Sequence, residues 1–236
     1  MRGIIGGTMT RFRITCLALG LIALGGTVAS AGGSGGSGDA VELPSPELGV
    51  DVPLHQALQE RRSVRRYQDR PLTLAEVGQL LWAAQGVTDS TTGYRTAPSA
   101  GATFPLEVYL VSGDVEGLAP GLYRYVPNNH TLRLRKDSDL LAGLHASGLQ
   151  QESLRAAPAV LVISAVHSRT ARRYGARAER YVAMEAGHAS QNIYLQAAAL
   201  GLGTVAIGAF DDAGVAGVLS LPGNEQPLYL MPVGAR

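Results

Sequence analysis

Residues 159–166 read Ala-Val-Leu-Val-Ile-Ser-Ala-Val, an apolar run broken only by one serine. A run of this kind predicts a strand that is covered on both faces, because neither set of alternate side chains is polar. The next long segment, residues 178–200, repeats apolar residues every three or four positions, which predicts a helix with one buried face. We expect that face to consist of Val182, Ala186, Ala189, Ile193, Ala197 and Leu200.

Shorter elements surround this strand and helix. Residues 121–126 and 131–135 alternate on either side of Pro127-Asn-Asn-His130, which predicts a hairpin. Thr73 and Glu76 form a capping-box pattern at the start of another helix. Further helices are expected at 52–61, 139–149 and after Asp211, further strands at 106–111, 204–210 and 228–233, and a long loop at 88–101. Hairpins and helix-linked strands together predict an α+β domain, with a central mixed or antiparallel sheet flanked by helices.

The first residues carry a different pattern. Arg11 and Arg13 precede the apolar run 14–24, and the small residues Val28-Ala-Ser-Ala31 follow. A basic start, an apolar middle and a small-x-small end are typical of a secretory signal peptide. We expect a signal at 1–31 with cleavage after Ala31, a Gly/Ser/Pro-rich linker at 32–50 and one folded domain at 51–236. The apolar run is too short to span a bilayer comfortably, so we expect export to the periplasm or the outside, with membrane anchoring by an uncleaved signal as the alternative.

Composition limits the classes of function. A formal net charge of +1 over 236 residues gives no reason to expect a nucleic-acid partner. Cys16 is the only cysteine, so neither a disulfide framework nor a thiolate metal site is expected. His188 follows Glu185 by three residues, but no further ligand converges with them. We therefore expect no metal, and interpret His188 as a histidine packed inside the core.

Four arginines lie within residues 61–67, Arg-Arg-Ser-Val-Arg-Arg-Tyr, directly after the expected first helix. Guanidinium groups offer N–H donors in a rigid fork that matches phosphate oxygens, so the cluster is a candidate phosphate site. The alternative is a solvated helix end, where arginines complement the helix dipole. A second candidate segment is Pro98-Ser-Ala-Gly101, whose small side chains would let a flat ligand approach the backbone closely.

Five segments, in this order along the chain, resemble the nitroreductase family, and more closely its SagB/thiazole-oxidase-type branch. They are Arg61-Arg-Ser-Val-Arg65, Pro98-Ser-Ala-Gly-Ala-Thr-Phe-Pro105, Gly187-His-Ala-Ser-Gln-Asn192, Ala199-Leu-Gly-Leu-Gly-Thr-Val-Ala-Ile-Gly-Ala-Phe-Asp211 and Pro232-Val-Gly-Ala-Arg236. The resemblance extends from Leu54 to Arg236. It implies a nitroreductase-like fold and a homodimer that binds FMN at its interface.

The resemblance also implies roles for particular residues. The FMN phosphate and ribityl chain would be held by Arg61, Arg62, Ser63, Arg65 and Arg236. The isoalloxazine ring would lie along Pro98, Ser99, Ala100 and Gly101. Backbone groups near flavin N5 would come from Ile207, Gly208 and Ala209. Such roles agree with the general chemistry of flavins, whose reactivity is tuned by hydrogen bonds near N1 and N5.

The implied function is that of an exported FMN-dependent oxidoreductase. A small-molecule donor would reduce the flavin at N5, leave, and be replaced by an acceptor in the same pocket, a ping-pong cycle in which NAD(P)H is one candidate donor. Arg173-Tyr174-Gly175 departs from the Lys-Tyr-Gly of azoline-oxidising members. Tyr174 could still act as a catalytic acid, but arginine does not give up its proton near neutrality. The alternatives are a peptide azoline dehydrogenase, a flavin-binding protein without turnover, and an interaction protein without a cofactor.

Overall fold

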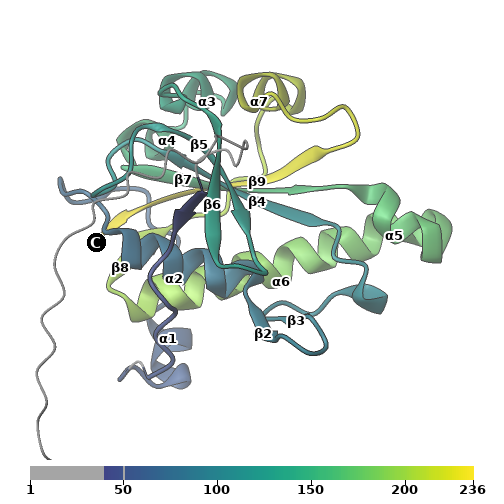
Figure 1. Ribbon diagram of the computed structural model, residues 1–236. Helices are drawn as coiled ribbons and strands as arrows, with labels where there is room; N and C mark the ends of the chain where they lie inside the picture. Colours follow the sequence, from purple (N-terminus) through teal and green to yellow (C-terminus); the bar gives the residue numbers. More distant parts are fainter. Residues whose placement is uncertain (1–39, 50) are drawn as a thin grey trace, which may run out of the picture. The chain divides into compact units, whose positions relative to one another are not determined.

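The computed structural model describes residues 40–49 and 51–236, which build a central sheet with helices on both faces (Figure 1). Within the described residues the sheet has seven strands in the order β1-β6-β5-β4-β7-β9-β8, and every neighbouring pair is antiparallel. The strands are β1 (Ala40–Glu42), β4 (Leu106–Ser112), β5 (Gly121–Val126), β6 (Thr131–Lys136), β7 (Ala159–Ala165), β8 (Leu202–Thr204) and β9 (Gln226–Ala235). The predicted α+β class is confirmed, and the sheet is antiparallel.

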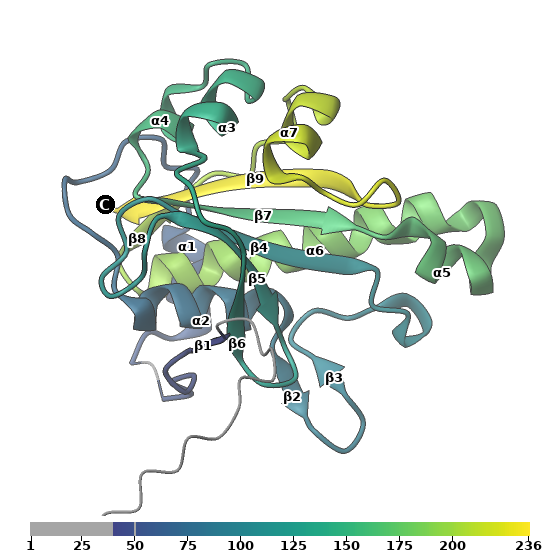
Figure 2. The same cartoon turned by 45° about the horizontal axis from the view of Figure 1, so that its top comes forward.

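The helices form one layer on each face of the sheet, as both views show (Figures 1 and 2). One layer contains α2 (Leu74–Gln85) and α6 (Ala178–Ala199), and the other contains α3 (Leu141–Ser147), α4 (Glu152–Ala156) and α7 (Asp212–Leu219). Helix α1 (Leu54–Glu60) contacts α6, and α5 (His167–Tyr174) leads into it through the 3-10 turn Gly175–Arg177. A two-stranded hairpin, β2 (Val87–Asp89) with β3 (Tyr94–Arg95), and a 3-10 turn at Ala100–Ala102 complete the described fold.

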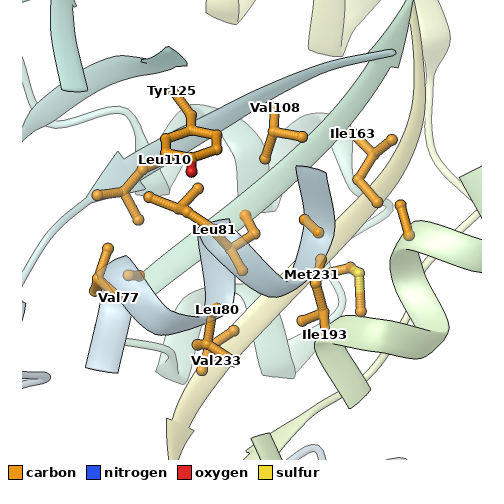
Figure 3. Close-up of a cluster of buried hydrophobic side chains, with 14 of the residues drawn as sticks. Val77, Leu80, Leu81, Val108, Leu110, Tyr125, Ile163, Ile193, Met231 and Val233 are labelled. Atoms are coloured by element: carbon orange, nitrogen blue, oxygen red, sulfur yellow. The ribbon is translucent and has the colours of Figure 1, made fainter. Parts of the chain in front are cut away.

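Strand β7 contributes to two separate hydrophobic cores. Leu161 and Ile163 pack into the core under α2 and α6, which Figure 3 shows with Ile163, Ile193 and Met231 among the labelled side chains. Val160 and Val162 point to the opposite face, into the core under α3, α4 and α7. Burial on both faces is therefore the reason why this strand carries no alternation of polar and apolar residues.

Most predicted elements are present, with shifted ends. The capping box at Thr73 and Glu76 is confirmed, and so is the long helix with its buried face. The predicted strand at 204–210 is wrong, because β8 ends at Thr204 and only Ile207 pairs again, in an isolated bridge with Leu230. The backbone N–H of Ala206 donates instead to the hydroxyl of Tyr194, 2.8 Å away, so this segment leaves the sheet.

The structure differs from the prediction in three further places. The predicted loop at 88–101 contains the β2–β3 hairpin, and α4 and α5 were not predicted. The predicted linker at 32–50 extends too far, since β1 pairs with β6 and Leu43 is buried in the core. The predicted signal at 1–31 lies outside the described residues. Within residues 40–49 and 51–236, no helix is both long enough and apolar enough to cross a membrane.

Candidate functional site

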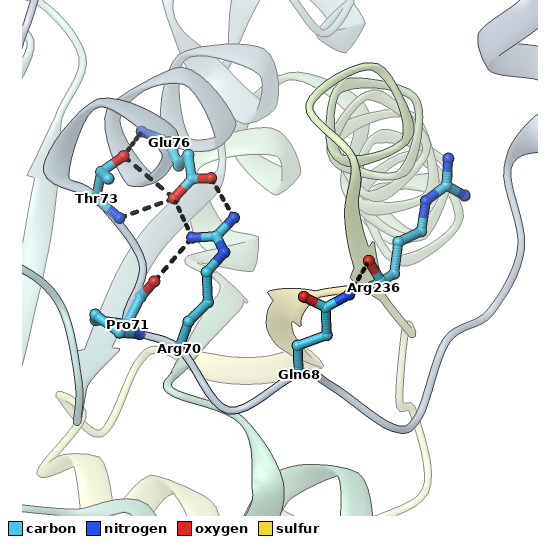
Figure 4. Close-up of polar contacts among 6 residues, drawn as sticks. All are labelled: Gln68, Arg70, Pro71, Thr73, Glu76 and Arg236. Carbon is cyan, nitrogen blue, oxygen red and sulfur yellow. Dashed lines mark hydrogen bonds and ion pairs between the residues drawn. The ribbon is translucent and has the colours of Figure 1, made fainter.

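The arginine-bearing segment 61–67 lies along the edge of the sheet formed by β8 and β9. The N–H of Val64 donates to the carbonyl oxygen of Thr204 at 2.9 Å, and Gln68 Nε2 donates to the backbone oxygen of Arg236 at 2.8 Å. Figure 4 shows this second contact, with the guanidinium of Arg236 extending away from Gln68. A Cβ on Gly203 would come within 2.5 Å of the Val64 side chain, so the close approach of the segment requires glycine there.

Tyr194 on α6 connects the arginine segment to the chain that follows β8. Its hydroxyl lies 3.0 Å from Ser63 Oγ and accepts the Ala206 N–H. The guanidinium carbon of Arg61 lies 5.2 Å from the centre of the Tyr194 ring, within the range of a cation–π contact. Tyr194 is not among the site residues predicted from the sequence. The available signal was a polar-tipped aromatic residue beside the apolar face of the predicted helix.

Arg236 reaches the same place from the end of β9. Its Nη2 lies 3.3 Å from Glu60 Oε2, at the end of α1, and 3.5 Å from the carbonyl oxygen of Ala198, near the end of α6. Two elements distant in sequence thus carry cations to the point where α1, α6 and β9 meet. We call Arg61, Ser63, Arg65, Tyr194 and Arg236 the arginine junction.

Two arginines of the cluster have distinct environments. Arg62 Nη1 donates to the backbone oxygens of Gln59 and Arg61, both at 2.8 Å, so its guanidinium stabilises the end of α1. Arg65 is exposed, two residues beyond Ser63. The structure therefore distinguishes side chains that the sequence presents as equivalent.

The second candidate segment lies against α6 and α5 and forms one side of a cavity of about 260 Å³. We call this cavity the small-residue cleft; its lining residues are Pro98, Ser99, Ala100, Tyr181, Met184, Glu185 and His188. Gly101 has a φ of 59°, and a Cβ there would lie 2.5 Å from the hydroxyl of Tyr174. Arg173 Nη1 donates to the Gly101 carbonyl oxygen at 3.2 Å. Tyr174 and the predicted ring-binding segment are thus brought together.

Glu185 is the buried acid of the small-residue cleft, with 2% of its surface exposed. Burial raises the pKa of its carboxyl to about 7, although the Ser99 side chain, the charge of Arg95 and the Ala100 backbone oppose this rise. Its Oε1 is buried and has no hydrogen-bond partner within the described part of the chain. The carboxyl can therefore hold a proton near neutral pH.

His188 is exposed at the edge of the cleft, so the interpretation as a core histidine is wrong. It lies on the flank of α6 that faces the cleft, whereas the buried face of the helix passes through Ala186 and Ala189. Among residues 40–49 and 51–236, no three His, Cys, Asp or Glu side chains gather where they could hold a metal ion.

The arginine junction and the small-residue cleft lie on different flanks of α6. Glu185 and Tyr194 are nine positions apart (194 − 185 = 9), which is about 13 Å along a helix and half a turn around it. Ile207, Gly208 and Ala209 directly follow Ala206. Ile207 is buried in the core under α3, α4 and α7, the carbonyl oxygen of Ala209 accepts a hydrogen bond from Gln151 Nε2 at 2.9 Å, and Gly208 and Ala209 are exposed. One copy of the chain therefore presents the predicted site residues in separate places.

Comparison with known proteins places the chain among relatives of similar fold. The model of the nitroreductase family matches residues 58–235. A nitroreductase-type protein of Methanocaldococcus jannaschii is 46% identical over 199 residues, which cover 84% of this chain and 98% of the relative.

Two solved structures of nitroreductase-type proteins agree with this. That from Ralstonia eutropha has 33% identity and a TM-score of 0.73, over 83% of this chain and 89% of its own. That from Anabaena variabilis has 30% identity and a TM-score of 0.74, over 84% of this chain and 42% of its own. The chain belongs to the nitroreductase family, whose members are flavin-using oxidoreductases.

Proposed function

We propose that this protein is an FMN-dependent oxidoreductase of the SagB-type branch, in which a donor and an acceptor occupy one pocket in turn. The observation that carries the proposal is the arginine junction, where Arg61 and Ser63 contact Tyr194 and Arg236 reaches Glu60, the residue before Arg61. Membership of the family supports a flavin cofactor, and the arginine junction supports a flavin that carries a phosphate.

The donor set of the junction suits a phosphate monoester. Guanidinium groups bind two phosphate oxygens at once, and a serine hydroxyl adds a shorter neutral contact. Glu60 balances part of the charge of Arg236, since it lies 3.3 Å from its Nη2. Arg61 and Arg65 then provide the charge that attracts a dianion. Arg62 would contribute indirectly, by stabilising the end of α1 that positions Arg61.

The small-residue cleft suits a flat ring, because Pro98, Ala100 and Gly101 present little side-chain bulk. A bound flavin would supply a ring that accepts and returns a hydride. Since one copy carries the junction and the cleft on different flanks of α6, we infer that the cleft of one protomer completes the junction of another in a homodimer. Exposed Leu54, Leu58 and Met184 on α1 and α6 give that pairing an apolar surface.

Two side chains at the cleft can handle protons. Glu185 can hold one near neutral pH, beside Ser99 and Ala100. The hydroxyl of Tyr174 lies against Gly101 and can donate one. Arg173 is anchored to the Gly101 carbonyl oxygen and remains charged, so it offers no base for an azoline substrate. Peptide azoline oxidation therefore remains the alternative function rather than the preferred one.

Replacing both Arg61 and Arg65 with alanine should weaken FMN binding about 100-fold or more. Each charged hydrogen bond is worth about 1.5–3 kcal/mol, and about 1.4 kcal/mol is a tenfold change in affinity. Fluorescence titration of the flavin-free variants gives the dissociation constants. Riboflavin, which lacks the phosphate, should bind wild type and double variant alike, and Arg66→Ala should leave FMN binding unchanged.

Equal FMN affinity in the double variant and wild type would refute the phosphate assignment. An equal loss of riboflavin affinity would show that the two arginines act on something other than the phosphate. A protein that has no visible flavin absorbance, and gains none when mixed with FMN, would overturn the cofactor proposal itself.

Mixing the flavin-loaded protein with NADH or NADPH without oxygen should bleach its visible flavin absorbance, and a quinone or nitroaromatic acceptor should restore it. Steady-state rates at several acceptor concentrations should give the parallel lines of a ping-pong cycle. Bleaching by dithionite but by no organic donor would favour a flavin-binding protein without turnover. Oxidation of a thiazoline peptide would favour the azoline alternative.

Glu185→Gln should stabilise the protein relative to wild type, and increasingly so as the pH rises from 4.5 to 7. Because the folded-state pKa is raised from its ordinary value of 4.5 to about 7, the unfolded chain loses this proton first, and wild-type stability falls across that window. The amide cannot titrate, so it lacks this loss. Denaturant unfolding across the window measures the difference, with exposed Glu179→Gln as the control. A difference that stays constant with pH would contradict the raised pKa.

We further propose that residues 1–31 direct export and are removed, as the basic, apolar and small-residue pattern of this segment supports. In a bacterial host that exports the protein, N-terminal sequencing should read Gly32 first. Uncleaved chain in the membrane fraction would support the anchor alternative, and uncleaved chain in the soluble cell fraction would refute export.

A further inference from the structure

A second group of arginines surrounds a small cavity that shares no lining residue with the small-residue cleft. The cavity measures about 120 Å³ and lies where the ends of α2 and β3 meet β4, β5 and α5. Its polar lining consists mainly of Gln85, Arg95, Glu107, Arg124 and Arg169. None of these residues belongs to the arginine junction, so the proposed flavin site does not account for them.

The cavity holds more positive than negative charge. Within the described residues, Glu107 is the one acidic side chain in its lining, and it is 6% exposed. Two nitrogens of Arg124 contact Glu107 Oε2: Nε donates to it at 2.8 Å, and Nη2 lies 2.7 Å from it. Arg169 Nη2 lies 2.5 Å from the other carboxylate oxygen, Oε1. A single carboxylate therefore faces three guanidinium groups, and both of its oxygens are already used.

Arg95 is the cation that Glu107 does not bind directly. Its guanidinium stacks on Phe104, 4.3 Å from the ring centre, and Nη1 donates to Gln85 Oε1 at 2.9 Å. Burial lowers the pKa of this guanidinium from its ordinary value, although Glu107 and Glu185 oppose the shift. Glu185 gives limited compensation, because burial also raises the pKa of its own carboxyl to about 7.

Gln85 supplies a second observation that points to a ligand. The residue is 1% exposed, and its Nε2 has no hydrogen-bond acceptor among residues 40–49 and 51–236. Leaving a buried amide donor unpaired costs about 1–3 kcal/mol, so native proteins usually provide an acceptor. The missing partner here is an acceptor, and the surrounding excess charge is positive.

We propose that this cavity binds a small oxyanion such as inorganic phosphate or sulfate. Liquid water occupies about 30 Å³ per molecule, so a space of this size accommodates about four waters or one tetrahedral oxyanion. Guanidinium forks match pairs of its oxygens, and Gln85 Nε2 gains an acceptor. Arg124 and Arg169, with side chains 41% and 35% exposed, leave a route from solvent.

The location of the cavity gives the anion a structural effect. Arg95 directly precedes the segment 96–104, and Arg169 Nη1 donates to the carbonyl oxygen of Phe104, 3.0 Å away, at its other end. The segment that lines the small-residue cleft therefore begins next to one arginine of this cavity, and its far end, Phe104, contacts both Arg95 and Arg169. An anion that neutralises them stabilises the segment.

The test compares phosphate, sulfate and chloride on the flavin-loaded protein, whose arginine junction is occupied. At matched ionic strength, phosphate or sulfate should raise the melting temperature in a saturable way and chloride should not. Calorimetric titration should find one oxyanion site per chain. The absence of saturable binding, or an equal response to chloride, would overturn the proposal and leave the flavin proposal untouched.

Gln85→Glu should replace the anion with a tethered carboxylate beside Arg95. We expect a higher melting temperature than wild type without oxyanion, and little further rise when phosphate or sulfate is added. Arg133→Gln, at an exposed position on β6, changes the net charge by the same amount and should keep the wild-type response. A full oxyanion response in Gln85→Glu would place the binding elsewhere and refute this site.

Discussion

Burial of β7 on both of its faces is the constraint on which the rest of the structure depends. Its odd- and even-numbered side chains enter different cores, so the sheet needs a helix layer on each side. Full burial of one leucine or isoleucine contributes about 1.5–3 kcal/mol, and a central strand that carries several such residues cannot be left open to water. The interior of the sheet is consequently filled, and the candidate ligand sites lie at the edge of the sheet, at the ends of its strands and on the outer flanks of the helices.

Helix α6 contributes side chains to both candidate binding regions. One face of the helix packs on the sheet, while its two flanks carry Glu185 toward the small-residue cleft and Tyr194 toward the arginine junction. Tyr194 holds together chain segments that are far apart in sequence, because one hydroxyl contacts Ser63 and accepts the N–H of Ala206. That second bond also explains why the chain leaves the sheet after β8 and exposes Gly208 and Ala209.

Arginine serves three different purposes in this fold. Arg62 donates to backbone carbonyl oxygens. Arg61 stacks on Tyr194 at the surface, and Arg236 pairs with Glu60 next to it. Arg95, Arg124 and Arg169 line a cavity that contains one carboxylate. The difference lies in the local balance of charge. A net charge of +1 for the whole chain hides both positive sites, because acidic residues elsewhere cancel them.

The sequence by itself was sufficient for features that depend on neighbouring residues. The apolar run of β7, the spacing along α6 and the capping box at Thr73 are local patterns, and the order of five short motifs indicated the family. Tertiary structure decided what depends on distant partners. The pairing of β1, the early end of β8, the raised pKa of Glu185 and the separation of junction and cleft all arise from contacts across the fold. Hydrogen bonding and desolvation act through space, so no local pattern encodes them.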